Sequence, residues 1–155
     1  MGASSAVADE YDSVMAEVIG FAESCSDDEW SVICPNEERT AGVLFDHIAV
    51  GNPEAMGWVE EFLAGRPVRI TPDVLHAGNA EHARNALARP RVDTINDLKE
   101  GTAGMSRFLR GLTDDQLKLE SDFGWAGQHD VEWLIGVTVR HPRNHLKSIR
   151  DAFGR

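Results

Sequence analysis

The sequence predicts an all-α protein: a four-helix bundle with a long crossover between the second and third helices. Three observations lead to this fold class. Apolar residues recur at three- and four-residue steps in four segments, which is typical of amphipathic helices. No segment alternates apolar and polar residues for long enough to indicate a sheet, and Val68-Arg69-Ile70 is too short. A stretch rich in Pro and Gly separates the second periodic segment from the third. At 155 residues the chain has the size of one domain, expected over residues 1–155.

The first two helices are predicted before this stretch. The first runs from about Ala6 to Ala22, and its apolar stripe continues to Cys25. The second opens at Thr40, a typical N-cap residue, and ends near Gly65. Asn52-Pro53 combines a cap residue with a first-turn proline, so we expect this helix to break or restart there. The stripes are Val7, Tyr11, Val14, Met15, Val18, Ile19 and Ala22, then Val43, Leu44, His47, Ile48, Met56, Val59 and Leu63.

The crossover and the third helix follow. Residues 66–79 show no helical period, and we expect them to form the irregular connection. A short helical lead over 80–88 is interrupted at Pro90. Thr113 to Gln116 resembles a capping box for one extra turn after the helix. The main body carries Ile95, Leu98, Thr102, Met105, Leu109 and Leu112 at helical spacing.

The fourth helix is expected after a glycine-containing loop at 123–128, with Asp130 as its N-cap. Pro142 lies inside this segment, where it removes the hydrogen bond to Thr138 and disfavours helical geometry at His141. We therefore expect either a kink that offsets His141 from the residues beyond it or a helix that starts near Pro142. The stripe is Val131, Leu134, Ile135, Thr138, His141, His145 and Ile149.

Composition excludes several classes of partner. The formal net charge is −11, which argues against binding nucleic acid or an anionic membrane, since both require a basic face. No apolar run reaches the ~18 residues of a membrane span, and the N-terminus lacks the basic start and apolar run of a signal peptide, so we expect a cytoplasmic protein. Cys25 and Cys34 form no CxxC pair and are expected to be reduced thiols rather than a disulfide or a zinc site.

His47, His141 and His145 are the candidate metal ligands. His141 and His145 stand four residues apart, on one helical face, although this spacing alone is more typical of a surface or core pair and lacks the glutamate of HExxH. Their position on the apolar stripe, and that of His47 after Val43 and Leu44, place all three toward the core. Three buried imidazoles without partners cost several kcal/mol, and a shared ion would satisfy them. Three protein ligands also leave a position open for water or substrate.

The remaining polar candidates have weaker claims. His76, His82 and His129 are expected at the surface, and His76 or His129 can line a pocket mouth. Asp46 points about 100° away from His47 on the helix, and Glu132 lies more than two turns from His141, so neither is expected to be a ligand. Three tryptophans are expected in the core or in a pocket wall, and no GxSxG elbow or Gly-rich phosphate loop is present. These tryptophans are Trp58, Trp125 and Trp133.

Two segments resemble the DinB-like family. TAGVLFDH, residues 40–47, is similar to the start of the family's second helix, and RHPRNHLKSIR, residues 140–150, to its last helix with an H-x-x-x-H-L-x-x-I pattern. Trp30 and LTDDQL at 112–117 also match the family's layout, whereas Arg39 stands where relatives often carry an aromatic residue. The resemblance implies a four-helix bundle that binds Zn or Ni through the three histidines. It also implies kinship with the N-terminal domain of mycothiol-dependent maleylpyruvate isomerase.

Two classes of function follow from these observations. The first is a metal-dependent transferase or isomerase that uses a low-molecular-weight thiol such as mycothiol, as some relatives do, with catalytic residues and substrate unassigned. The alternative is a non-catalytic metal- or small-molecule-binding bundle, associated with bacterial stress. A bundle without metal is a third reading, which the three core-facing histidines argue against. A homodimer through helix faces is compatible with an acidic bundle of this size.

Overall fold

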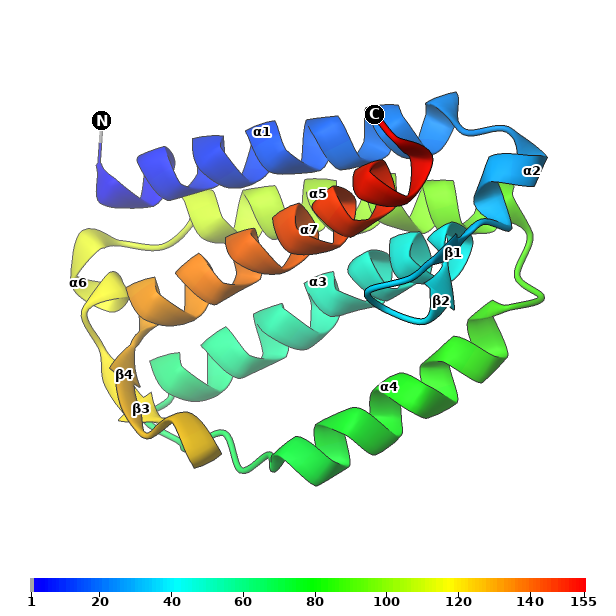
Figure 1. Ribbon diagram of the computed structural model, residues 1–155. Coiled ribbons are helices and arrows are strands. Elements are labelled where there is room, and N and C mark those ends of the chain that lie inside the picture. Colours follow the sequence, from blue (N-terminus) through cyan, green and yellow to red (C-terminus); the bar gives the residue numbers. More distant parts are fainter. Residues whose placement is uncertain (1) are drawn as a thin grey trace.

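The computed structural model describes residues 2–155, and its architecture is the predicted four-helix bundle. The four long helices are α1 (Ala3–Ser24), α3 (Ala41–Leu63), α5 (Arg91–Arg110) and α7 (Val131–Phe153). Both α1 and α3 pack against α5 and α7, so α1 and α3 occupy opposite corners of the bundle (Figure 1). The three candidate metal-ligating histidines therefore belong to two adjacent helices, α3 and α7.

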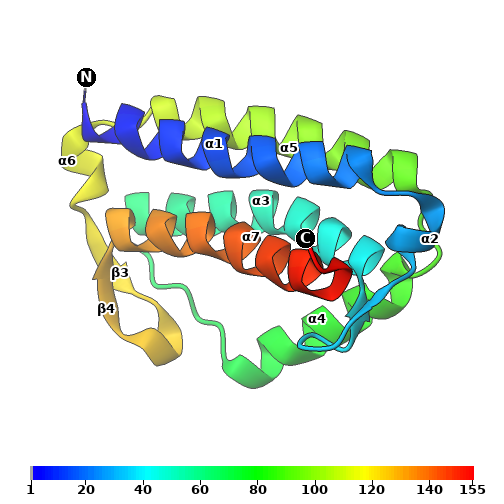
Figure 2. The same cartoon turned by 45° about the horizontal axis from the view of Figure 1, so that its top comes forward.

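The direction of the helices explains the long connection. In both views α1 and α7 run one way, while α3 and α5 run the other way (Figure 2). Because α3 and α5 are parallel neighbours, the chain must travel back along the bundle between them. A further helix, α4 (Pro72–Ala86), covers much of that distance and contacts α3.

The irregular connection expected over residues 66–79 was wrong for its second half, because α4 begins at Pro72. Thr71 caps this helix by accepting a hydrogen bond from the Val74 amide at 3.3 Å, and Pro72 fills the first helical position. Thr-Pro-Asp was thus a start signal in the sequence. A weak apolar stripe concealed α4, which buries only Ala86.

Short elements close the ends of the bundle. Two antiparallel hairpins, β1–β2 and β3–β4, lie in loops that the sequence did not assign to strands. The Thr113–Gln116 capping box is confirmed, with both reciprocal hydrogen bonds at 3.2 and 2.9 Å. The short elements are α2 (Asp27–Trp30), β1 (Ile33–Cys34), β2 (Arg39–Thr40), α6 (Asp114–Leu117), β3 (Glu120–Asp122), the 3-10 helix η1 (Gly124–Ala126) and β4 (Gln128–Asp130).

The core lies between the four long helices and uses the predicted stripes. Its largest fully buried side chains include Tyr11, Phe45, Phe62, Leu98 and Leu134. Burying one such side chain stabilises the fold by about 1.5–3 kcal/mol relative to leaving it in water. The predicted caps are also present: Thr40 accepts from the Val43 amide at 3.2 Å, and Asp130 accepts from the Trp133 amide at 2.8 Å.

Both internal prolines lie inside continuous helices, so the break expected at Pro53 and the alternative of a helix start near Pro142 were wrong. Each proline removes one backbone hydrogen bond, but apolar residues on both sides of it bury the same helix face against the core. Asn52, expected to cap a restarted helix, instead accepts a 2.6 Å hydrogen bond from the Tyr11 hydroxyl. Core packing therefore outweighs the local preference for a break.

Two expectations about the chain's environment can be compared with the fold. Within residues 2–155, no helix combines the length and the apolar character needed to cross a membrane. Cys25 and Cys34 are both buried free thiols, as predicted. Burial raises the pKa of the Cys34 thiol to about 11, with a smaller contribution from Glu37, so neither chemistry nor position favours a reactive thiolate there.

Candidate metal centre

The structure brings His47, His141 and His145 together. Nε2 of His141 lies 2.9 Å from Nε2 of His47 and 3.1 Å from Nε2 of His145. One ring nitrogen from each residue falls within 4.8 Å of the other two. The offset expected from Pro142 does not separate His141 from His145, because α7 continues through the proline. Three side chains separated by up to 98 residues in sequence thus form one cluster.

Two neighbouring helices position these imidazoles. His47 lies on the face of α3 that meets α7, whereas His141 and His145 occupy successive turns of α7. Gly51 follows one turn after His47, and a Cβ at this position would lie 3.4 Å from Cε1 of His141. The His141 ring therefore lies against α3 at Gly51, where a Cβ would be in van der Waals contact with it.

His47 and His141 are in the neutral form that binding a cation requires. Burial lowers the pKa of His47 to about 3, with smaller contributions from His141, His145, His82 and the positive charge of Arg39. Burial, and then His145, lower the pKa of His141 to about 4. Both rings are therefore neutral near pH 7, and a neutral imidazole offers a nitrogen lone pair to a metal.

A divalent ion fits this set of donors. Nitrogens bound at about 2.0–2.1 Å in a tetrahedral arrangement lie about 3.3 Å apart, close to the observed separations. Nε2 of His141 lies within hydrogen-bond distance of Nε2 of both His47 and His145, while Nδ1 of His47 has no partner within residues 2–155. The three residues can hold a metal ion, and imidazole suits Zn and Ni among others.

Glu37 completes the cluster, and sequence reasoning missed it. Its Oε1 lies 3.0 Å from Nδ1 of His145 and accepts a hydrogen bond from the Ser148 hydroxyl at 3.1 Å. Since a carboxylate only accepts, Nδ1 of His145 carries the proton and Nε2 keeps its lone pair for the centre. Glu37 lies in the turn between β1 and β2, where no periodic pattern distinguishes it from neighbouring acidic residues.

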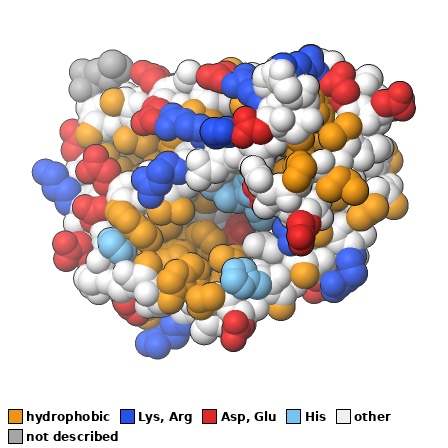
Figure 3. Space-filling model, in the orientation of Figure 1, with side chains coloured by type: hydrophobic (Ala, Val, Ile, Leu, Met, Phe, Trp, Pro, Cys, Tyr) orange, Lys and Arg blue, Asp and Glu red, His pale blue; other side chains and the backbone are white. Residues whose placement is uncertain are grey.

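The three imidazoles line a cavity of about 310 Å³. Figure 3, in the orientation of Figure 1, shows a hollow in the surface of the molecule, with hydrophobic side chains around it and histidine side chains in its wall. The far end of the cavity is aromatic: Phe123 stacks edge-to-face with Trp58 at 5.2 Å and with Trp125 at 5.5 Å between ring centroids. Trp58 and Trp125 are pocket-wall residues, as the sequence analysis allowed, whereas Trp133 packs against the core.

Two further charged residues line the cavity besides Glu37. Arg39, on β2, is the one Lys or Arg that lines it in the part of the chain the structure describes. Glu54 stands two turns beyond His47 on α3, and partial burial raises its pKa. Arg39 thus lies just before α3, and His47, Glu54 and Trp58 follow one another along this helix.

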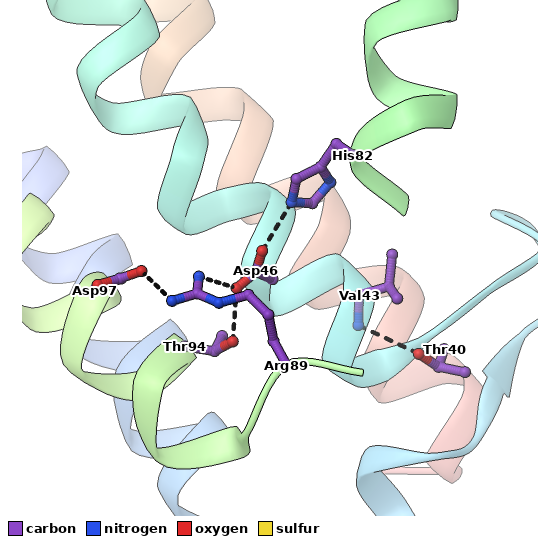
Figure 4. A network of polar contacts seen from close by, with 7 residues as sticks. All are labelled: Thr40, Val43, Asp46, His82, Arg89, Thr94 and Asp97. Atoms are coloured by element: carbon purple, nitrogen blue, oxygen red, sulfur yellow. Dashed lines mark hydrogen bonds and ion pairs between the residues drawn. The ribbon is translucent and has the colours of Figure 1, made fainter. Parts of the chain in front are cut away.

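Asp46 is not part of the histidine cluster; it is buried, and its carboxylate is engaged in a separate network (Figure 4). It accepts hydrogen bonds from Thr94 Oγ1 at 2.6 Å, Arg89 Nη1 at 2.7 Å and His82 Nε2 at 2.8 Å. The surface position expected for His82 was wrong: its side chain is only 18% exposed, because it crosses from α4 to reach Asp46. This network ties α3, α4 and α5 together.

The other histidines lie outside the cluster. His76 is exposed on α4, as expected. His129 is partly buried and stacks on Trp133 with ring centroids 3.7 Å apart, so its expected surface position was only partly right. Neither residue lines the cavity. Glu132 is exposed on the first turn of α7, consistent with its exclusion as a ligand.

Comparisons with known proteins agree with this architecture. Among solved structures, the chain is similar to YfiT from Bacillus subtilis, described as "a probable metal-dependent hydrolase with an unusual four-helix bundle topology". The two are 16% identical, with a TM-score of 0.80 over 96% of this chain and 85% of YfiT. No curated protein matches the chain. The family model of the DinB superfamily matches residues 10–149, almost the full length. The chain therefore belongs to the DinB superfamily.

Proposed function

We propose that this chain is a metal-dependent enzyme that binds Zn or Ni through His47, His141 and His145. The observation that carries the proposal is the convergence of three Nε2 atoms in the wall of a cavity. A structural zinc site is normally closed by four protein ligands, whereas three ligands beside a cavity suit a reactive centre. When bound, the ion supplies Lewis-acid activation of a water or thiol at neutral pH.

The residues around the cluster have separate roles in this proposal. Glu37 holds His145 in the tautomer that directs Nε2 to the centre. The aromatic end of the cavity excludes water and takes the apolar part of a substrate. Glu54 is the candidate proton carrier, because a carboxyl group with a raised pKa can exchange a proton closer to neutral pH.

For the reaction, we favour transfer or isomerisation with a low-molecular-weight thiol such as mycothiol. The resemblance to thiol-dependent relatives supports this choice, and the cavity has room for a small thiol beside the imidazoles. Hydrolysis is the second candidate, favoured by the description of YfiT as a probable metal-dependent hydrolase. Both reactions need the same metal centre and differ in the nucleophile.

Metal content tests the centre directly. We expect purified protein reconstituted with Zn to bind one ion per chain by elemental analysis, and His145→Ala to lose most of it. His76→Ala is the matched control, since His76 is an exposed histidine outside the cluster. Unchanged stoichiometry in His145→Ala would rule out the proposed ligands. Titrating mycothiol or cysteine into the loaded protein then separates the nucleophiles: tight thiol binding supports transfer, and its absence supports hydrolysis.

A further inference from the structure

Arg39 has no role in the metal centre described above, yet it lines the same cavity. Its guanidinium makes no ion pair or side-chain hydrogen bond with any of residues 2–155. By contrast, Arg66 and Arg110 pair with carboxylates at 2.7 Å. Arg39 is partly buried on β2, directly before the Thr40 N-cap of α3, and its positive charge is among the influences on the pKa of His47. A partly desolvated guanidinium without an anion is a suitable binding group for one.

The rest of the cavity restricts what that anion can be. Glu37 is already engaged by His145 and Ser148, and no second Lys or Arg of the described chain lines the cavity. One guanidinium matches one negative charge, and its planar fork matches a carboxylate, whereas phosphate sites commonly gather several cationic or backbone donors.

The opposite end of the cavity is apolar. Trp125 is 50% exposed there. Its ring packs edge-to-face against Phe123, which packs edge-to-face against Trp58. An exposed tryptophan at a cavity rim is typical of a binding surface, because its large apolar area stays in water until a ligand covers it. A cavity of about 310 Å³ also suits a compact ligand.

We propose that Arg39 and the Trp58–Phe123–Trp125 wall select an amphipathic monocarboxylate, with its carboxylate on Arg39 and its flat apolar part on the aromatic wall. This inference rests on the proposed function for the position of the reacting group, which would lie between these two ends, beside the imidazoles. The carboxylate can belong to the substrate or to a thiol co-substrate, and both share the same contact with Arg39.

Tryptophan fluorescence tests this selection, because Trp58 and Trp125 line the cavity. The probes are 3-phenylpropanoate against 3-phenylpropanamide for a substrate-like ligand, and N-acetylcysteine against its amide for a thiol. We expect at least one acid to bind on the order of 10–100-fold more tightly than its amide. The pair that shows this preference identifies the source of the carboxylate. Equal binding of acid and amide in both pairs would overturn the proposal.

Arg39→Gln should abolish the preference, while Arg69→Gln, the same change at an exposed arginine outside the cavity, should preserve it. A preference that survives in Arg39→Gln would show that the metal alone selects the acid and would overturn the proposal. Arg39→Lys is the alternative variant if Arg39→Gln does not fold. A lysine keeps the charge without the planar guanidinium, so its preference for the acid should be intermediate. An undiminished preference in Arg39→Lys would contradict the role of the guanidinium.

The two proposals fail separately. Arg39→Gln should bind Zn with the stoichiometry of the parent protein, because Arg39 is not among the ligands. The preference for the acid should also persist in protein treated with a chelator, since the ion pair to Arg39 needs no metal. Loss of metal binding with a persistent Arg39-dependent preference would therefore contradict only the metal centre.

Discussion

Asp46 and His47 are neighbours in sequence, but they belong to two polar centres of opposite character. Asp46 faces α4 and α5, where three side chains donate to its carboxylate (Figure 4). His47 faces α7, where its Nε2 meets another ring nitrogen and its Nδ1 has no partner among residues 2–155. The Asp46 carboxylate has its donors within the protein, while Nδ1 of His82, like Nδ1 of His47, has no partner among residues 2–155. The His47 centre instead gathers three ring nitrogens that can hold one cation, and this difference distinguishes a structural polar site from one adapted to a ligand.

The comparison predicts its largest effect at Asp46. Asp46→Ala should lower the free energy of unfolding by about 3–5 kcal/mol, because it leaves Arg89 without its buried counter-charge and His82 and Thr94 without their acceptor. Urea denaturation measures the loss. Asp122→Asn and Asp46→Asn serve as controls. The exposed Asp122 should tolerate the change, whereas Asp46→Asn should lower the free energy of unfolding by most of the amount lost in Asp46→Ala. A loss under 1 kcal/mol in Asp46→Ala would remove the contrast between the centres.

The next effect concerns the metal. Zn at 100–1,000 times its dissociation constant should stabilise the protein by about 3–4 kcal/mol, since it binds the folded chain. His47→Gln should cancel this gain. His76→Gln, an exposed histidine, should retain it. Thermal unfolding with Zn and with EDTA gives the comparison, and equal stabilisation of parent and His47→Gln protein would exclude His47 as a ligand.

A smaller effect is expected at Glu37. Glu37→Gln weakens the hydrogen bond that fixes the tautomer of His145, so Zn affinity should fall about 10–100-fold, or about 1.4–2.8 kcal/mol. A competition titration with a chromophoric chelator measures the dissociation constant. Glu38→Gln changes the neighbouring exposed residue and should leave the affinity unaltered. Equal affinities in the two variants would mean that Glu37 does not orient the ligand.

The smallest effect appears when acid is added to metal-free protein. His47 and His141 have pKa values lowered to about 3 and about 4, below their unfolded values near 6.5. Between the folded and unfolded pKa values, the unfolded chain binds more protons than the folded chain. The free energy of unfolding therefore falls as the pH decreases from about 6.5 toward 4. We expect a loss of about 1–2 kcal/mol between pH 7 and 5, after discounting for partial exposure. Urea denaturation at both pH values should show a weaker dependence in a His47→Gln/His141→Gln variant; an unchanged dependence would contradict this assignment.

Pattern alone was sufficient for much of the fold. The four apolar stripes and the capping residues Thr40, Thr113 and Asp130 predicted the long helices and the extra turn, because helical periodicity and cap chemistry are local properties. The errors occurred where local preference and packing disagreed. Pro53 indicated a break and Pro142 a kink or a helix start, but both helices continue through the prolines, and the apolar faces on both sides of them are buried.

The candidate site likewise combines features that are visible in the sequence with features that only the fold creates. The sequence by itself singled out the three histidines as candidate ligands, since each lies on the apolar stripe of its own helix and matches the resemblance to the family. Only the tertiary structure decided that α3 and α7 are adjacent, which brings the Nε2 atoms to 2.9 and 3.1 Å of each other. It also placed Glu37 and Arg39 beside them and drew His82 inward to Asp46. Such contacts join distant segments, and a side chain in a turn or on a weakly amphipathic helix carries no periodic signal of its partner.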